Sequence, residues 1–135
     1  MSRIDELLDN LQVAADSFNR IPQAAIDVLS ERHRQVAVEG FDERHDDRHD
    51  RGELARAAVS YATHSIVVAE LLADGMPPEK IVAASMNAGV PRTWPWDRIW
   101  WKPQDPRRNL VRAAALIIAE IERLDRAEAR KAGQK

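Results

Sequence analysis

The sequence predicts a single all-α domain, a compact bundle of four to five helices covering residues 1–135. Apolar residues recur at helical spacing in several segments, and nowhere do they alternate with the period of two that is typical of strands. Proline and glycine separate these segments, and the chain length suits one hydrophobic core. A Trp- and Pro-rich loop before the last helix cannot be regular helix.

The first two predicted helices lie within residues 1–40. In the N-terminal segment 1–20, Ser2 and Asp5 resemble a capping box. A helix over about residues 3–18 is predicted by the helical spacing of Ile4, Leu7, Leu8, Leu11, Ala15 and Phe18. A second helix begins at Pro22 and stops at Gly40. Its apolar stripe of Ile26, Leu29, His33 and Val36 predicts that His33 faces inward. The opposite face either meets water or converges on a ligand through Glu31, Arg34, Gln35 and Val38.

Three further helices complete the bundle. A long helix runs to about Ala73, with Asp50 as its predicted N-cap and Glu53 as the reciprocal partner. Pro77 and Pro78 restart the chain into a short helix. Asp105 and Pro106 begin the last helix, whose tail over residues 127–135 is expected to fray. Its apolar stripe consists of Leu110, Ala114, Ile117, Ile121 and Leu124.

Composition excludes several classes of function. A net charge of −2 argues against a nucleic acid polymer as partner, and the absence of cysteine excludes thiolate metal sites and cysteine nucleophiles. The longest apolar run, Ala113 to Ala119, is too short to span a bilayer. Acidic residues in the first turns do not fit a signal peptide. We therefore expect a cytoplasmic protein with no membrane contact.

The first polar loop, residues 41–51, contains five acidic residues, two histidines and three arginines. Asp46, Asp47 and Glu53 are candidate ligands for Mg²⁺ or Mn²⁺, and His45 and His49 are candidate catalytic residues that could assist a water molecule. The alternative is a solvated polar loop. Histidines four apart bind metal best on a helix, whereas these two precede one.

The second loop, residues 90–106, contains all four tryptophans of the chain. Indole faces can stack on bases, and neighbouring cations suit phosphate. The predicted ligand-binding residues are therefore Arg34, Trp96, Trp101, Lys102, Arg107 and Arg108. Two or three of the tryptophans should be core, and at most two should touch the ligand. Arg107 and Arg108 occupy a first helical turn, where cations are unfavourable, so they should be balanced either by a bound anion or by Asp97, Asp105 or acidic residues of the first loop.

Several stretches form a recognisable set in chain order: Glu31-Arg32-His33-Arg34-Gln35, Glu39-Gly40-Phe41, His45-Asp46-Asp47 with His49, Gly52-Glu53-Leu54-Ala55, Trp94-Pro95-Trp96, Trp100-Trp101-Lys102-Pro103 and Leu110 to Asp125. Over about residues 28–126 the chain resembles a family of small, uncharacterised phage and prophage proteins. The Glu-Arg-x-Arg-Gln opening and the last helix also look like MazG-type all-helical nucleotide pyrophosphohydrolases.

The resemblance to MazG-type enzymes implies an oligomer and a magnesium site between a Glu-x-x-Glu helix and a Glu-x-x-Asp helix. This chain departs from that pattern, because its third helix offers Glu53-x-x-Arg56. Glu122-x-x-Asp125 is present, but it lies near the end of the last helix. Whether the protein is an enzyme is therefore left open by the sequence.

Three hypotheses follow for the function. The first is a phage-type protein that binds a small phosphorylated nucleotide and sequesters a host nucleotide signal. The second is a metal-dependent, MazG-like nucleotide phosphohydrolase, and the third is a helical module for protein interaction or structure. We also expect a homo-oligomer, because alanine-rich faces such as Ala113 to Ala115 allow helices to approach closely.

Overall fold

The computed structural model describes residues 2–134, apart from the side chains of Phe18 and Asn19. Within this range the chain forms helices and no strand, which confirms the all-α prediction. The α-helices are α1 (Arg3–Asn19), α2 (Gln23–Ala37), α3 (Glu43–Asp47), α4 (Glu53–Ala73), α5 (Ile81–Asn87) and α6 (Pro106–Gly133), with 3₁₀ turns η1 (Pro78–Lys80) and η2 (Arg98–Trp100). The short helix α3 forms inside the predicted first loop and α6 extends through the tail.

The helix ends follow local rules at most of the predicted positions. Asp105 accepts a hydrogen bond from the Arg108 backbone N–H at 3.0 Å, which confirms the cap of α6. Gly40, at φ +74°, lets the chain turn back after α2. The predicted cap of α4 is wrong, because Gly52 precedes that helix and no side chain caps it. A cap instead starts α3, where Asp42 accepts from the His45 N–H at 2.9 Å.

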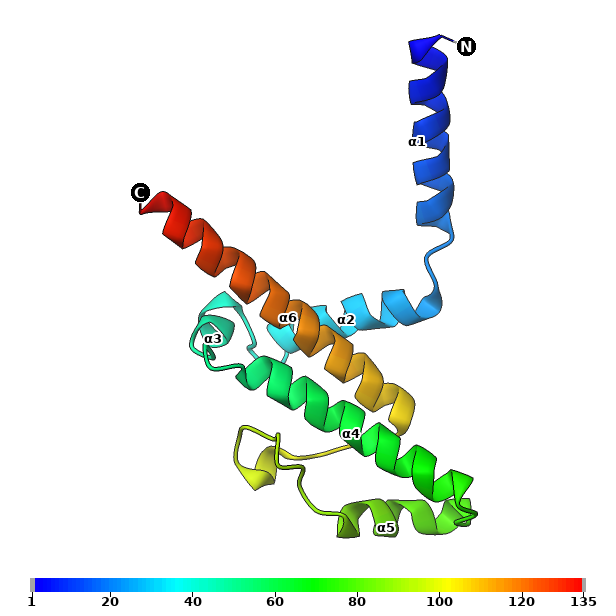
Figure 1. Ribbon diagram of the computed structural model, residues 1–135, viewed down its shortest axis with the longest axis vertical. Coiled ribbons are helices and arrows are strands. Elements are labelled where there is room, and N and C mark those ends of the chain that lie inside the picture. Colours follow the sequence, from blue (N-terminus) through cyan, green and yellow to red (C-terminus); the bar gives the residue numbers. More distant parts are fainter. Residues whose placement is uncertain (1, 135) are drawn as a thin grey trace.

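The core lies between α4 and α6, which run side by side in opposite directions (Figure 1). Small residues on both helices, including Ala57 and Ala113, allow close packing around Leu54 and Leu116. The second loop folds back against α4 and adds tryptophan rings to this core. Within the described residues, no helix has the length and apolarity that a membrane crossing requires.

Helix α2 presents its polar face inward, against the expectation from its apolar stripe. Glu31 and Gln35 are each only 2% exposed, whereas His33 and the other residues of the stripe are mostly exposed. The inward orientation of His33 was therefore predicted wrongly. The reason is that α2 meets α6 through charged pairs, such as Arg32 with Glu122 at 3.0 Å, and these place the polar side against the bundle.

Two long apolar surfaces remain uncovered in the single chain. Helix α1 projects away from the other helices (Figure 1), and its side chains Ile4, Leu7, Leu8 and Leu11 are exposed. The side chain of Phe18 lies outside the described residues. The predicted stripe of α6 also faces outward, because Leu110, Ile117, Ile121 and Leu124 are all about half exposed. The core-facing residues of α6 are instead Asn109, Val111, Ala113, Ala115, Leu116 and Ala119.

Candidate functional site

A cavity of about 740 Å³ lies where the two polar loops meet. Its walls come from the inward face of α2, the first loop, α4, the second loop and α6. Pockets for small ligands commonly have volumes between roughly 300 and 1,000 Å³, so this space is large enough for a nucleotide. The fold thus brings into one place two segments about fifty residues apart in the sequence.

Aromatic rings run in an unbroken row from one loop to the other. Phe41 stacks on His45 with ring centroids 4.3 Å apart, and His45 meets His49 at 4.7 Å. His49 contacts the edge of Trp96 at 5.4 Å, and Trp96 contacts Trp94 at 5.3 Å. All five rings line the cavity, as does Trp100, which is 62% exposed. The cavity therefore offers several flat apolar surfaces.

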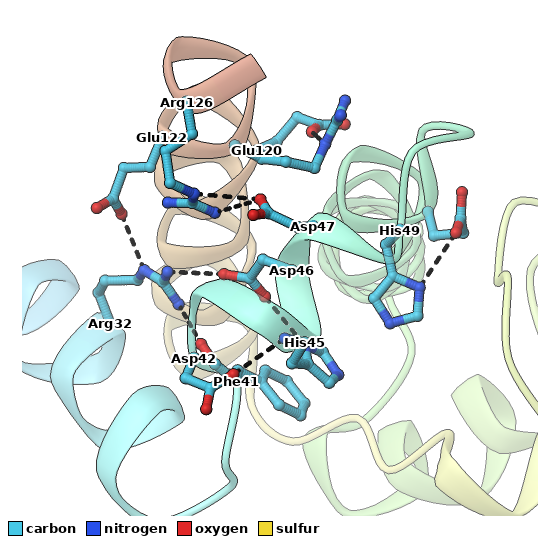
Figure 2. A network of polar contacts seen from close by, with 12 residues as sticks. Arg32, Phe41, Asp42, His45, Asp46, Asp47, His49, Glu120, Glu122 and Arg126 are labelled. Atoms are coloured by element: carbon cyan, nitrogen blue, oxygen red, sulfur yellow. Dashed lines mark hydrogen bonds and ion pairs between the residues drawn. The ribbon is translucent and has the colours of Figure 1, made fainter. Parts of the chain in front are cut away.

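The carboxylate of Asp46 is fully buried and lies within hydrogen-bond distance of neighbouring side chains (Figure 2). Arg32 donates to it at 2.8 Å, and His45 Nδ1 lies 3.0 Å from its other oxygen. Arg32 also donates to Glu122 and to the Phe41 carbonyl. This network fixes the first loop to α2 and α6, so Asp46 has a structural role in the fold.

The other two candidate metal ligands point elsewhere. Asp47 accepts a hydrogen bond from Arg126 at 2.9 Å (Figure 2) and another from Arg130 at 3.1 Å, and the Arg126 contact is the main reason that the pKa of Asp47 is lowered. Glu53 pairs with His49 at 3.1 Å. Among the described residues, no three His, Asp or Glu side chains are placed to hold a metal ion. The structure therefore does not bring Asp46, Asp47 and Glu53 together, and the arrangement of these three carboxylates does not fit a site for Mg²⁺ or Mn²⁺.

His45 and His49 do reach the cavity, as candidates for catalysis should. Each histidine has its Nδ1 close to a carboxylate, Asp46 for His45 and Glu53 for His49. Burial tends to raise the pKa of Glu53, but hydrogen bonds from His49 and from the Arg51 backbone lower it overall. A carboxylate beside Nδ1 orients the imidazole ring. The two histidines thus form an ordered part of the aromatic wall.

The inward face of α2 contributes a buried ion-pair cluster. Glu31 accepts hydrogen bonds from Arg34 at 2.6 Å and from Arg108 at 2.5 Å, and Arg34 also donates to Glu39 at 2.9 Å. Burial would raise the pKa of Glu31, yet the two arginines hold it below its ordinary value. The hydrogen bond to Glu31 is also the main cause of a raised pKa for Arg34. Glu31 is thus ionised and neutralised within the wall.

The predicted ligand-binding residues divide into two groups. Arg34, Trp96 and Lys102 line the main cavity. Trp101 is buried in the core and is not among the cavity-lining residues, so its assignment to the ligand site is corrected. Two tryptophans, Trp94 and Trp101, are buried in the core, which agrees with the two or three expected from the sequence, and three, Trp94, Trp96 and Trp100, line the cavity.

Arg107 and Arg108 lie outside the main cavity. Both face a smaller neighbouring cavity of about 380 Å³, where Arg107 pairs with Asp27 at 2.7 Å and Arg108 with Glu31. Carboxylates therefore do balance these cations, although they come from α2 and not from the loops or from Asp105.

Among the cavity residues that the sequence did not assign to the ligand site are Gln35, Trp100 and Arg112. Arg112 lies over the Tyr61 ring at 5.6 Å and donates to the Lys102 carbonyl at 3.0 Å. The sequence placed Gln35 on the polar face of the second helix, which it expected either to meet water or to converge on a ligand. Its inward orientation, however, contradicts the apolar stripe and required the tertiary structure.

Comparisons of this chain with protein-family models, curated proteins and solved structures gave no match.

Proposed function

We propose that this protein binds a small phosphorylated nucleotide in the cavity between the two loops. The observation that carries the proposal is the combination, in one cavity, of exposed aromatic faces and two cations with no carboxylate partner among the described residues. Those cations are Lys102 and Arg112. Aromatic faces bind bases by stacking, and cations bind phosphate.

The cavity charges support a ligand that is both flat and anionic. Two of the three acidic wall residues, Glu31 and Glu39, are already paired with Arg34, and the third, Asp97, accepts a hydrogen bond from the Ile99 backbone N–H. Trp100 and Lys102 are two positions apart in the sequence, and both line the cavity, so a stacking surface and a phosphate-binding group face the same space. A neutral apolar ligand would leave both Lys102 and Arg112 uncompensated.

We propose further that binding sequesters a nucleotide signal of the host. The support is the resemblance of residues 28–126 to small phage and prophage proteins. Sequestration needs only affinity, which the stacking and charge of the cavity can supply. It does not require a metal site, and the three candidate metal ligands, Asp46, Asp47 and Glu53, are engaged with arginine or histidine.

A matched pair of variants tests the site. Trp100 and Ile99 are 62% and 68% exposed, so replacing either with alanine should leave the fold intact, but only Trp100 lines the cavity. Binding of the common nucleoside mono- and diphosphates is measured by calorimetry, with and without Mg²⁺. Trp100→Ala should weaken binding about tenfold or more, since stacking on one aromatic is worth roughly 1–3 kcal/mol. Ile99→Ala should not change it.

Two results would overturn the proposal. The first is that none of these nucleotides binds the wild-type chain or raises its melting temperature. The second is equal affinity in the Trp100→Ala and wild-type proteins. Release of phosphate or pyrophosphate at a steady rate would instead identify an enzyme and exclude pure sequestration.

A further inference from the structure

Two buried polar atoms in the cavity wall have no hydrogen-bond partner among the described residues. They are the side-chain carbonyl oxygen Oε1 of Gln35 and the Nε of Arg112. The third such atom, His64 Nε2, belongs to a residue that does not line the cavity. Most of the unsatisfied buried polar atoms therefore gather at one place, and they include both an acceptor and a donor.

An unpartnered buried acceptor destabilises a folded protein, because it has lost its hydrogen bonds to water and gained none. Gln35 is only 2% exposed, so bulk solvent does not compensate for the loss. An apolar side chain of similar shape would serve the fold as well or better. The packing of the protein thus does not explain why an amide stands at this position. A ligand with an N–H donor would explain it, because the donor would give Oε1 its missing hydrogen bond.

The Arg112 guanidinium is held in a defined orientation beside it. Its Nη1 donates to the Lys102 carbonyl, and the group lies over the ring of Tyr61. These contacts use one nitrogen and one face of the guanidinium and leave Nε without an acceptor. The same wall therefore offers an acceptor on Gln35 and a donor on Arg112.

We propose that Gln35 recognises the base of the bound nucleotide by accepting a hydrogen bond from its exocyclic amino group, while Arg112 Nε donates to an acceptor on the same ligand. This inference rests on the proposed nucleotide site and narrows its ligand to nucleotides with an amino-bearing base. A carboxamide is well suited to such a base, because it pairs with an amino group and the ring nitrogen beside it. Stacking supplies affinity for any base, whereas Gln35 discriminates between bases.

The test compares two probes that differ only in the amino group, adenosine 5′-monophosphate and purine riboside 5′-monophosphate. Calorimetry measures the affinity of both for the wild-type chain and for Gln35→Met, which keeps the side-chain length and removes the amide. The wild-type protein should bind the amino-bearing probe about tenfold more tightly. Gln35→Met should bind both probes equally. Gln23→Met, the same change on the exposed side of α2, should keep the wild-type preference.

The melting temperature of the ligand-free variants provides a second readout. Gln35→Met should melt at the wild-type temperature or higher, because it removes an unsatisfied polar atom. A fall of several degrees would show that the amide stabilises the fold, and it would overturn the inference. Equal binding of both probes by the wild-type chain would also overturn it while leaving the nucleotide site in place. If neither probe nor any other nucleotide binds, the proposed function fails and the inference fails with it.

Discussion

Arg108 donates a hydrogen bond to the buried carboxylate of Glu31 over 2.5 Å, and this contact joins the first turn of α6 to the inward face of α2. The positive end of a helix dipole disfavours a cation there, so an anion must balance it. The chain provides that anion itself. Arg108 is therefore part of the packing between α2 and α6, and the phosphate-binding cations of the proposed site are Lys102 and Arg112.

Replacing Arg108 should affect stability more than ligand binding. Arg108→Ala removes one of the two partners of a buried carboxylate, and we expect a loss of roughly 1–3 kcal/mol in the free energy of unfolding. Arg107→Ala is the matched control, because its pair with Asp27 is exposed and should matter much less. Urea denaturation measures both. Unchanged stability of Arg108→Ala, together with weaker nucleotide binding, would restore Arg108 to the ligand site.

Replacing Asp46 should destabilise the protein in a way that metal ions do not influence. Asp46→Ala leaves Arg32 without its buried partner, and breaking such a pair costs roughly 3–5 kcal/mol. Asp50→Ala should have little effect, since Asp50 is exposed and caps no helix. Thermal melts with Mg²⁺, with Mn²⁺ and with a chelator measure this. A stabilisation by metal that only Asp46→Ala abolishes would support the metal site instead.

Stability should fall as the pH drops below about 6.5, because His64 is buried as the neutral form. The Asn109 side-chain NH₂ group points at His64 Nδ1 at 2.9 Å, and its orientation is set by the Gln104 backbone, so Nδ1 accepts and cannot carry a proton. Burial accordingly lowers the pKa of His64. In the unfolded chain His64 becomes protonated near pH 6.5, whereas in the folded chain it stays neutral to lower pH. Acid therefore favours the unfolded state.

The pH effect is measured by urea denaturation between pH 7.5 and 5.5, where most carboxylates stay ionised. His64→Leu should be less stable at neutral pH but should lose most of this pH slope. His33→Gln should keep the slope, because His33 is exposed. A wild-type stability that is flat across this range would contradict the prediction.

The exposed apolar rows should lead the chain to self-associate. Leu110, Ala114, Ile117, Ile121 and Leu124 follow a spacing of four and three residues, which is the repeat of helices that pack against each other. Helix α1 also needs a partner, because an isolated helix of its length is only marginally stable in water. We expect sedimentation to give a mass above that of one chain.

A double variant tests whether the apolar row of α6 forms the contact between chains. Ile117→Arg with Ile121→Arg should lower the measured mass, since charges cannot be buried at an apolar interface without a partner. Val82→Arg is the control, because Val82 on α5 is also an exposed apolar residue but lies outside the row. A wild-type chain that remains monomeric at high concentration would refute the prediction.

The sequence alone determined where most helices begin and end. Asp105 caps α6, Gly40 follows α2, and the segments between them have helical periodicity, because capping and backbone strain depend on residues only a few positions apart. The same local reasoning found that two polar loops hold the distinctive side chains, and Trp96, Lys102 and the two histidines do line the cavity.

Only the tertiary structure decided which face of each helix points inward. The stripes of α2 and α6 predicted apolar contacts, yet α2 buries Glu31 and Gln35, and α6 leaves Ile117 and Ile121 exposed. The reason is that contacts such as Arg108 with Glu31 and Arg32 with Asp46 join residues far apart in the sequence. Periodicity shows that a helix has two unlike faces. Which face is buried depends on the partners that the rest of the chain brings to it.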